Sequence, residues 1–286
     1  MVLGIVLSAA ALVIAAVALF VNIGRLRFDR MVAREVRALY ADVRPGREEI
    51  DVARAVEGLP APAARYLRLA LGDTATAAAA CRLRHGGTFR LGPDKPWLKI
   101  SGEQYYTLQS PAFIWHATAR MAPLLWFEAR DSYAGGVGRL LARVNSSVTV
   151  AEATGEDVGV SALYRWLAEA PWFPQAFVVA DGISWETAGD ASARAVVRDG
   201  SASAGVVFHF SPEGMIERMT ADDRTRDVDG RQVVQKWSAL YRDWREVEGV
   251  KVPFDCEVSW HPDEGDFSYA RFVLERVEYN TPARFE

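Results

Sequence analysis

The sequence predicts an α+β protein: a mainly antiparallel, curved β-sheet or open barrel around one amphipathic helix, preceded by a transmembrane helix and a helical stalk. Three observations predict it. Residues 2–23 are apolar and carry no charged side chain. From about residue 80 onward, short β-branched or aromatic segments recur between Gly, Pro and Asp residues. One segment of helical periodicity, about 157–170, interrupts them.

The apolar run at the N-terminus predicts a membrane anchor. As a helix, a run of this length rises roughly 33 Å, enough to cross the hydrocarbon core of a bilayer. A cleaved signal peptide would have a basic leader and a small-residue cleavage site, and residues 2–23 show neither. A buried helix of a soluble protein explains the run less well than a membrane span does. We therefore expect a retained single-pass anchor over residues 1–24.

Basic residues close to the anchor predict its orientation. The positive-inside rule places the C-terminal domain on the cytoplasmic side, because the arginines all follow the run. The extracytoplasmic side is the alternative. The arginines concerned are Arg25, Arg27, Arg30, Arg34 and Arg37.

Helical patterns continue after the anchor, and we expect a stalk over residues 25–76. Val32, Val36 and Tyr40 recur at helical spacing. Shorter helices are predicted at about 49–59 and 63–71, the second stopped by a glycine.

The remaining residues, 77–286, are expected to form the antiparallel β domain. Acid–glycine pairs mark its hairpin turns, at Asp199-Gly200, Glu213-Gly214, Asp229-Gly230 and Glu248-Gly249. Residues 138–152 are interpreted as one strand. Helices between the strands, which parallel pairing would need, are not evident. The one inserted helix, about 157–170, carries an apolar face at Leu163, Trp166, Leu167 and Ala170.

Composition narrows the possible functions. The formal net charge of −4 argues against a nucleic-acid partner. Two cysteines (Cys81 and Cys256) and four scattered histidines have no metal-ligand spacing. A nucleophile elbow and a P-loop are both missing from the sequence. We therefore predict no metal, no cofactor and no catalytic residue. The sequence leaves open whether the protein is an enzyme, and it favours a protein that is not one.

The densest cluster of aromatic and charged residues is the segment 164–174, and we expect a ligand to contact Arg165, Trp166, Glu169 and Trp172 there. Arg165 and Glu169 are four residues apart and can pair along the helix. If buried, Glu169 would have a raised pKa. Plain packing of the helix on the sheet is the alternative interpretation.

Two predicted strands supply the other candidate ligand-binding residues: Trp115, His116, Asp131 and Tyr133. On a strand, His116 faces away from Trp115, whereas Asp131 and Tyr133 share one face. Purely structural hydrogen bonds are the alternative role for these side chains.

Taken together, several motifs resemble an uncharacterised bacterial family of membrane-anchored proteins, a domain of unknown function. The resemblance covers about residues 60–280 and depends on the segments 62–67, 111–117, 130–133, 164–174 and 278–280. The family implies no named activity. Its strand–helix–strand order is similar to that of lipoprotein carriers, in which an open barrel around a helix shelters acyl chains outside the cytoplasm. That analogy concerns the fold and not the function.

The sequence leaves three functions open. The first is a non-enzymatic, membrane-tethered binder of a membrane lipid or other small hydrophobic ligand, suggested by the anchor, the curved sheet and nine tryptophans. The second is a structural or protein-interaction module, whose protein partner the sequence does not identify. The third is a membrane-associated hydrolase or transferase, which would require Glu169, His116 and Asp131 to converge.

Overall fold

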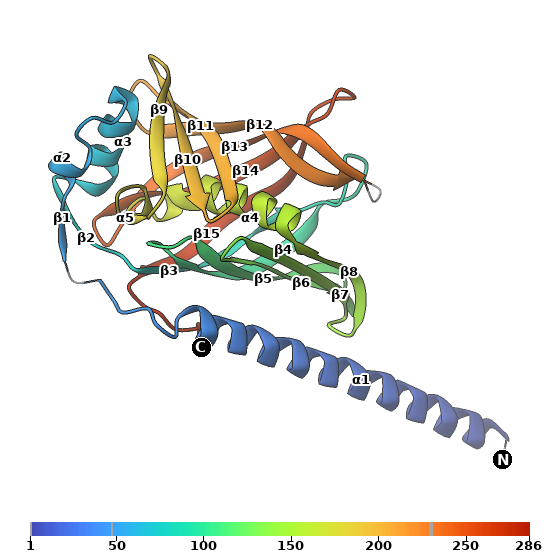
Figure 1. Ribbon diagram of the computed structural model, residues 1–286. Helices are drawn as coiled ribbons and strands as arrows, with labels where there is room; N and C mark the ends of the chain where they lie inside the picture. The colour runs from blue at the N-terminus through green and yellow to red at the C-terminus, as the bar shows by residue number, and fades with distance from the viewer. Residues whose placement is uncertain (1, 47, 229–230) are drawn as a thin grey trace.

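The computed structural model describes residues 2–46, 48–228 and 231–286 (Figure 1). A 13-stranded antiparallel sheet dominates it, with the strand order β8-β7-β6-β5-β4-β3-β15-β14-β13-β12-β11-β10-β9. Each half is a meander of consecutive strands, and the pairing of β3 with β15 joins the halves. The end strands β8 and β9 do not pair with each other, so the curved sheet stays open. The predicted α+β class with an antiparallel curved sheet is confirmed.

Thirteen strands make up the two halves of this sheet. The first half comprises β3 (Ala80–Phe89), β4 (Leu98–Thr107), β5 (Ala112–Ala122), β6 (Leu125–Ala134), β7 (Val137–Val144) and β8 (Val148–Gly155). The second half comprises β9 (Ile183–Gly189), β10 (Ser192–Asp199), β11 (Ala202–Phe210), β12 (Ile216–Val228), β13 (Arg231–Val247), β14 (Val250–His261) and β15 (Phe267–Tyr279).

Helix α4 (Glu156–Glu169) lies against the concave face of the sheet, as predicted for the inserted helix (Figure 1). It contacts β6, β7 and β8 on one side and β10, β11 and β12 on the other, so it bridges the two ends of the open sheet. Leu163, Trp166 and Leu167 are fully buried in the main core. A 3-10 turn, η1 (Ala170–Trp172), and the short helix α5 (Ala176–Val179) follow it.

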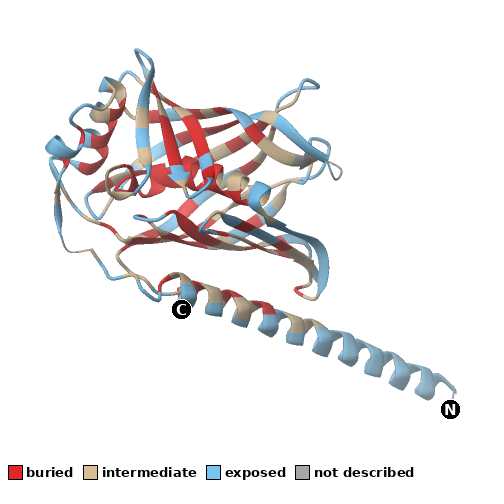
Figure 2. Cartoon of the chain, in the orientation of Figure 1, coloured by how far each residue is buried: buried red, intermediate tan, exposed pale blue. Residues whose placement is uncertain are grey.

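Helix α1 (Val2–Leu39) has two distinct parts (Figure 2). Its first part is apolar, exposed to solvent, and long enough to cross a membrane. Its second part packs on the convex face of the sheet through Phe28, Val32 and Val36, which recur every fourth residue. The partners of these side chains include Tyr105 of β4 and Phe285 near the C-terminus. The apolar part of α1 therefore continues without a break into a part that packs on the β domain.

Between α1 and the sheet, one predicted element is wrong. Residues 49–51 form strand β1 (Glu49–Asp51), not the start of a helix, because they pair with β2 (Thr74–Thr76). Only the four residues of α2 (Val52–Ala55) are helical, and Asp51 caps them by accepting from the backbone N–H of Arg54. The predicted helix at 63–71 is present as α3 (Ala61–Leu71), which joins the main core.

A second difference concerns residues 138–152, which form two strands, β7 and β8, and not one. The break is a turn in which Asn145 and Ser146 have φ angles of 47° and 60°. Asn tolerates this left-handed conformation better than most residues. The predicted glycine turns at Gly200, Gly214 and Gly249 connect neighbouring strands, whereas the one predicted at Asp229-Gly230 lies outside the described residues.

Candidate ligand-binding site

A cavity of about 580 Å³ lies between α4 and the concave face of the sheet. Its walls are mainly apolar, from Phe89, Ile100, Ala117, Ala119, Phe127, Trp237, Val258 and Phe272. Leu91, Leu140 and Val150 also line it and are themselves exposed, so the cavity opens to solvent beside them. A cavity of this volume and character is typical of sites for small molecules.

Small inward-facing side chains create this space. Alternate residues of a strand point to the same face, and on β5 the inward positions that line the cavity are Trp115, Ala117 and Ala119. The neighbouring strands repeat the pattern with Ala129 on β6 and Ala142 on β7. Alanines at these positions leave room between the sheet and α4 that larger side chains would occupy.

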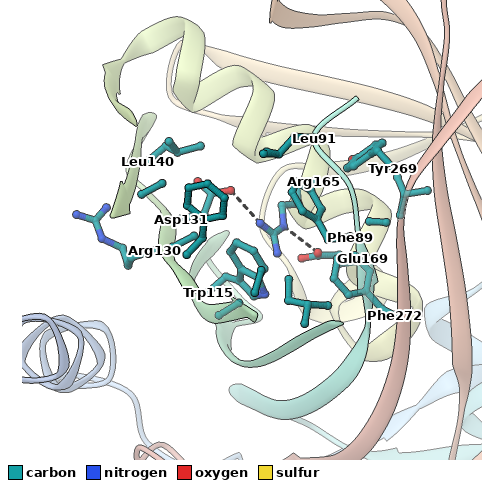
Figure 3. Close-up of a pocket in the computed structure, with 18 of the residues that line it drawn as sticks. Phe89, Leu91, Trp115, Arg130, Asp131, Leu140, Arg165, Glu169, Tyr269 and Phe272 are labelled. Carbon is teal, nitrogen blue, oxygen red and sulfur yellow. Dashed lines mark hydrogen bonds and ion pairs between the residues drawn. The ribbon is translucent and has the colours of Figure 1, made fainter. Parts of the chain in front are cut away.

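One charged cluster lies in the cavity wall, centred on Arg165 of α4 (Figure 3). Its Nε donates to Glu169 Oε1 at 2.8 Å, and its Nη1 donates to Asp131 Oδ2 at 2.8 Å. Its Nη2 donates to Gln104 Oε1 at 3.3 Å. The guanidinium also lies 4.6 Å from the ring centroid of Trp115, within the range of a cation–π contact. All three nitrogens of Arg165 therefore have acceptors.

The carboxylate of Glu169 is equally well satisfied. Its second oxygen accepts from Gln104 Nε2 at 2.5 Å and from the Tyr106 hydroxyl at 2.9 Å. Burial raises the pKa of Glu169, and Arg165 partly offsets that effect. Burial by itself would lower the pKa of Arg165. The negative charges of Glu169 and Asp131 have the larger effect, so the pKa of Arg165 is raised. The cluster is thus an internally balanced group of buried charges.

A histidine not predicted from the sequence orients Trp115. Trp115 Nε1 donates to His85 Nε2 at 2.9 Å, so that nitrogen carries no proton. His85 Nδ1 lies 3.2 Å from the Gly86 carbonyl, to which it can donate. Burial lowers the pKa of His85 to about 4, which keeps the ring neutral at physiological pH.

Five of the eight sequence-predicted binding residues line the cavity: Trp115, Asp131, Arg165, Glu169 and Trp172. The other three lie elsewhere. Trp166 is in the main core and donates from Nε1 to the Thr107 carbonyl at 3.3 Å. Tyr133 is buried beyond the cavity and donates to Asp199 Oδ2 at 2.7 Å.

His116, the third of these residues, faces the convex side of the sheet. Its ring lies 5.6 Å from that of Phe28 on α1, and its Nε2 lies 2.7 Å from Glu128 Oε1. Strand alternation places it opposite Trp115, as expected. The sheet therefore separates His116 from Asp131 and Glu169, and the three do not form one polar centre.

The structure offers little to a metal ion. Across the described parts of the chain, no group of three His, Cys, Asp or Glu side chains is placed to bind one. Cys81 and Cys256 are buried free thiols. Burial raises the pKa of both thiols, which makes them poor nucleophiles.

Comparison with known proteins identifies the family. A model of the family of unknown function DUF6544 matches residues 49–272. The chain belongs to the DUF6544 family. This confirms the predicted membership of a family of unknown function, and the matched region contains the cavity and α4. No curated protein sequence matches this DUF6544 protein.

Three solved structures resemble the DUF6544 chain at low identity. A DUF1329 family protein from Desulfovibrio piger is 12% identical, with a TM-score of 0.41 over 81% of this chain and 95% of that one. A LolA superfamily protein from Nitrosomonas europaea is 8% identical, with a TM-score of 0.38 over 73% and 88%. An outer membrane lipoprotein-sorting protein domain from Vibrio parahaemolyticus is 7% identical, with a TM-score of 0.37 over 71% and 86%. Likeness at this level carries no argument about function.

Proposed function

We propose that this DUF6544 protein is a membrane-anchored, non-enzymatic binding protein that holds a lipid or another hydrophobic molecule in the cavity between α4 and the sheet. The cavity is the observation that carries the proposal, because it combines a volume of about 580 Å³ with mainly apolar walls. The proposed contacts of the ligand are the five sequence-predicted residues that line the cavity: Trp115, Asp131, Arg165, Glu169 and Trp172.

The anchor supports the same proposal. Residues 1–24 are proposed to span the membrane, so the domain would work beside a large supply of apolar molecules. The rim of the cavity opening is also apolar, since Leu91 is 63% exposed and Val150 is 52% exposed. Exposed aliphatic side chains at an opening suit the passage of an acyl chain better than that of a polar metabolite.

Photo-crosslinking of the full chain in lipid nanodiscs tests this function. A fatty acid with a diazirine near the middle of its chain would be activated by light, and the modified peptides would be identified by mass spectrometry. We expect adducts on the cavity faces of β5, β6 and β14 as well as on α1. Adducts on α1 show that the probe was present in the nanodisc. Adducts on α1 without any in the cavity would therefore contradict the proposal.

A matched pair of variants on β6 controls this experiment. Ala129→Phe places a large ring in the cavity, whereas Ala134→Phe places the same ring on an exposed position of the same strand. We expect Ala129→Phe to remove most cavity adducts and to leave those on α1 unchanged. Ala134→Phe should behave as the wild type does.

We further propose that the domain faces the cytoplasm, as the arginine flank indicates. Ser201, in the exposed turn between β10 and β11, can be replaced by Cys. The native thiols are buried and will not compete. A membrane-impermeant maleimide should label Ser201→Cys only after cell lysis, and labelling of intact cells would place the domain outside.

A further inference from the structure

Arg224 of β12 lines the same cavity as Arg165 but is bonded very differently. Among the described residues, only its Nη2 has an acceptor, since it donates to the Ser161 carbonyl at 3.2 Å. Its Nε and Nη1 are buried and have no hydrogen-bond partner among the described residues. The residue is 8% exposed. A buried cation left in this state costs free energy unless an anion accompanies it.

The charged residues that the structure describes around the cavity do not provide that anion. Asp131 and Glu169 are the carboxylates that line it, and both already pair with Arg165. Arg130 also borders the cavity, but its side chain points away (Figure 3) and pairs with Glu35 of α1. Among the described lining residues, Arg224 is therefore the cation without a carboxylate partner.

Aromatic rings hold Arg224 in place without neutralising it. Its guanidinium carbon lies 3.9 Å from the ring centroid of Trp237 and 5.2 Å from that of Trp260. Tyr269, another lining residue, accepts from Trp237 Nε1 at 3.2 Å and keeps its own hydroxyl proton. Burial lowers the pKa of Arg224, and the neighbouring Tyr269 hydroxyl and Asp131 offset that effect only in part.

A β-bulge turns this arginine inward. Along β12, Met219 and Ala221 are buried, so strict alternation would next point residue 223 to the inside. The register instead shifts between Ala221 and Arg224, where β12 has one residue more than β13. Arg224 consequently faces inward and Asp223 is exposed. Bulges that re-aim a side chain are common beside binding sites.

We infer that the ligand of this cavity is an amphiphile with an anionic head group, a carboxylate or a phosphate monoester, that pairs with Arg224. An anion beside Arg224 supplies the missing acceptors, and the apolar walls accommodate the chain attached to it. The inference rests on the proposed function and adds the chemistry of the head group. It also gives Arg165 and Arg224 separate roles, because the first is neutralised within the protein and the second by the ligand.

The test compares three diazirine probes that share one alkyl chain, in nanodiscs of zwitterionic lipid at pH 8: a fatty acid, an alkyl phosphate and the neutral alcohol. We expect the full chain to give roughly tenfold more cavity adducts with an anionic probe than with the alcohol, as one charged hydrogen-bonded pair provides. The stronger of the two anionic probes identifies the head group.

Variants of two arginines on the same strand give this test its control. Arg224→Met should abolish the preference for the anions while the alcohol still labels the cavity. Arg218→Met removes the same charge from an exposed position of β12 and should keep the preference. If Arg224→Met does not fold, Arg224→Lys, which retains the charge, should keep part of the preference.

Failure of this inference differs from failure of the proposed function. Equal labelling of the wild type by all three probes would overturn the head-group assignment and leave the cavity as a site for neutral lipids. A preference that persists in Arg224→Met would overturn it as well. Cavity labelling by none of the probes would instead contradict the binding function itself.

Discussion

Arg165 Nε and Glu169 Oε1 lie 2.8 Å apart, one helical turn along α4, and form an ion pair in the wall of the cavity. Both side chains are largely buried, with exposed fractions of 14% and 11%. Asp131 on β6 binds the other end of the same guanidinium. Arg165 therefore connects α4 to the sheet through its ion pair with Asp131, and burial protects these charges from screening by solvent.

Removing the cation from this cluster should destabilise the protein strongly. Arg165→Met keeps the length of the side chain but leaves the carboxylates of Glu169 and Asp131 without a cation. We expect the free energy of unfolding to fall by about 3 kcal/mol. Urea unfolding of the full chain in detergent micelles, followed by tryptophan fluorescence, measures the change.

An exposed ion pair provides the control for that variant. Arg194 pairs with Glu186 at 3.0 Å, but both side chains are well exposed. Arg194→Met should therefore cost less than about 1 kcal/mol. Equal losses from the two variants would show that the Arg165 cluster contributes no more than a surface pair does.

Much of this site follows from periodicity that is visible in the sequence. The i, i+4 spacing placed Arg165 beside Glu169, and strand alternation placed Trp115 and His116 on opposite faces. These relationships are local, since they depend only on the geometry of one helix or one strand. Local pattern does not show that α1 covers the convex face, so the sequence also predicts a ligand contact for His116, which instead packs against Phe28 of α1.

The sequence does not predict Arg224 or His85 as residues of the site, for a different reason. Arg224 faces inward because of a bulge whose position depends on pairing between β12 and β13. His85 contacts Trp115 because β4 pairs with both β3 and β5, which brings His85 Nε2 within 2.9 Å of Trp115 Nε1. Both features depend on how neighbouring strands pair, and one sequence does not reveal the register of a sheet.

The buried His85 should make stability depend on pH. Its pKa is about 4 in the folded protein and about 6.5 in an unfolded chain. Between these values the unfolded state binds a proton that the folded state does not, so stability falls as the pH is lowered from 6.5 to 4. The loss attributable to His85 is about 3 kcal/mol.

A His85→Gln variant isolates this contribution. Carboxylates that titrate in the same range are common to both proteins and cancel in the comparison. We expect the free energy of unfolding to fall less steeply with acidification in His85→Gln than in the wild type. The difference in slope corresponds to the uptake of up to one proton on unfolding. Identical slopes in the two proteins would mean that His85 is charged in the folded state.

The C-terminus should hold α1 against the domain. Phe285 is buried, its ring lies 4.3 Å from the guanidinium carbon of Arg82, and its neighbour Arg284 pairs with Asp29 of α1. Phe285→Ala should weaken this packing by about 3 kcal/mol. Hydrogen exchange should become faster in residues 28–40 and stay unchanged in α3, and unchanged exchange in residues 28–40 would refute the role of the C-terminus.

Close packing of α4 on β7 depends on two glycines. A Cβ added at Gly159 of α4 would lie 2.0 Å from the Gly136 carbonyl oxygen, and one added at Gly138 would lie 2.4 Å from the Val158 backbone. Gly159→Ala should therefore destabilise the protein by roughly 1–3 kcal/mol, although alanine is the better helix former by about 1 kcal/mol. Thermal unfolding of the full chain gives the sign of the change.

The sign of the stability change shows whether close packing or helix propensity dominates at Gly159. Gly4→Ala, in the exposed part of α1, meets no atom within 4 Å and should leave the unfolding of the β domain unchanged. Because Leu140 of β7 borders the cavity opening, displacing α4 from β7 should also alter crosslinking by the fatty-acid probe. A stabilised Gly159→Ala protein with wild-type crosslinking would mean that α4 tolerates a larger separation from the sheet than its contact with Gly136 indicates.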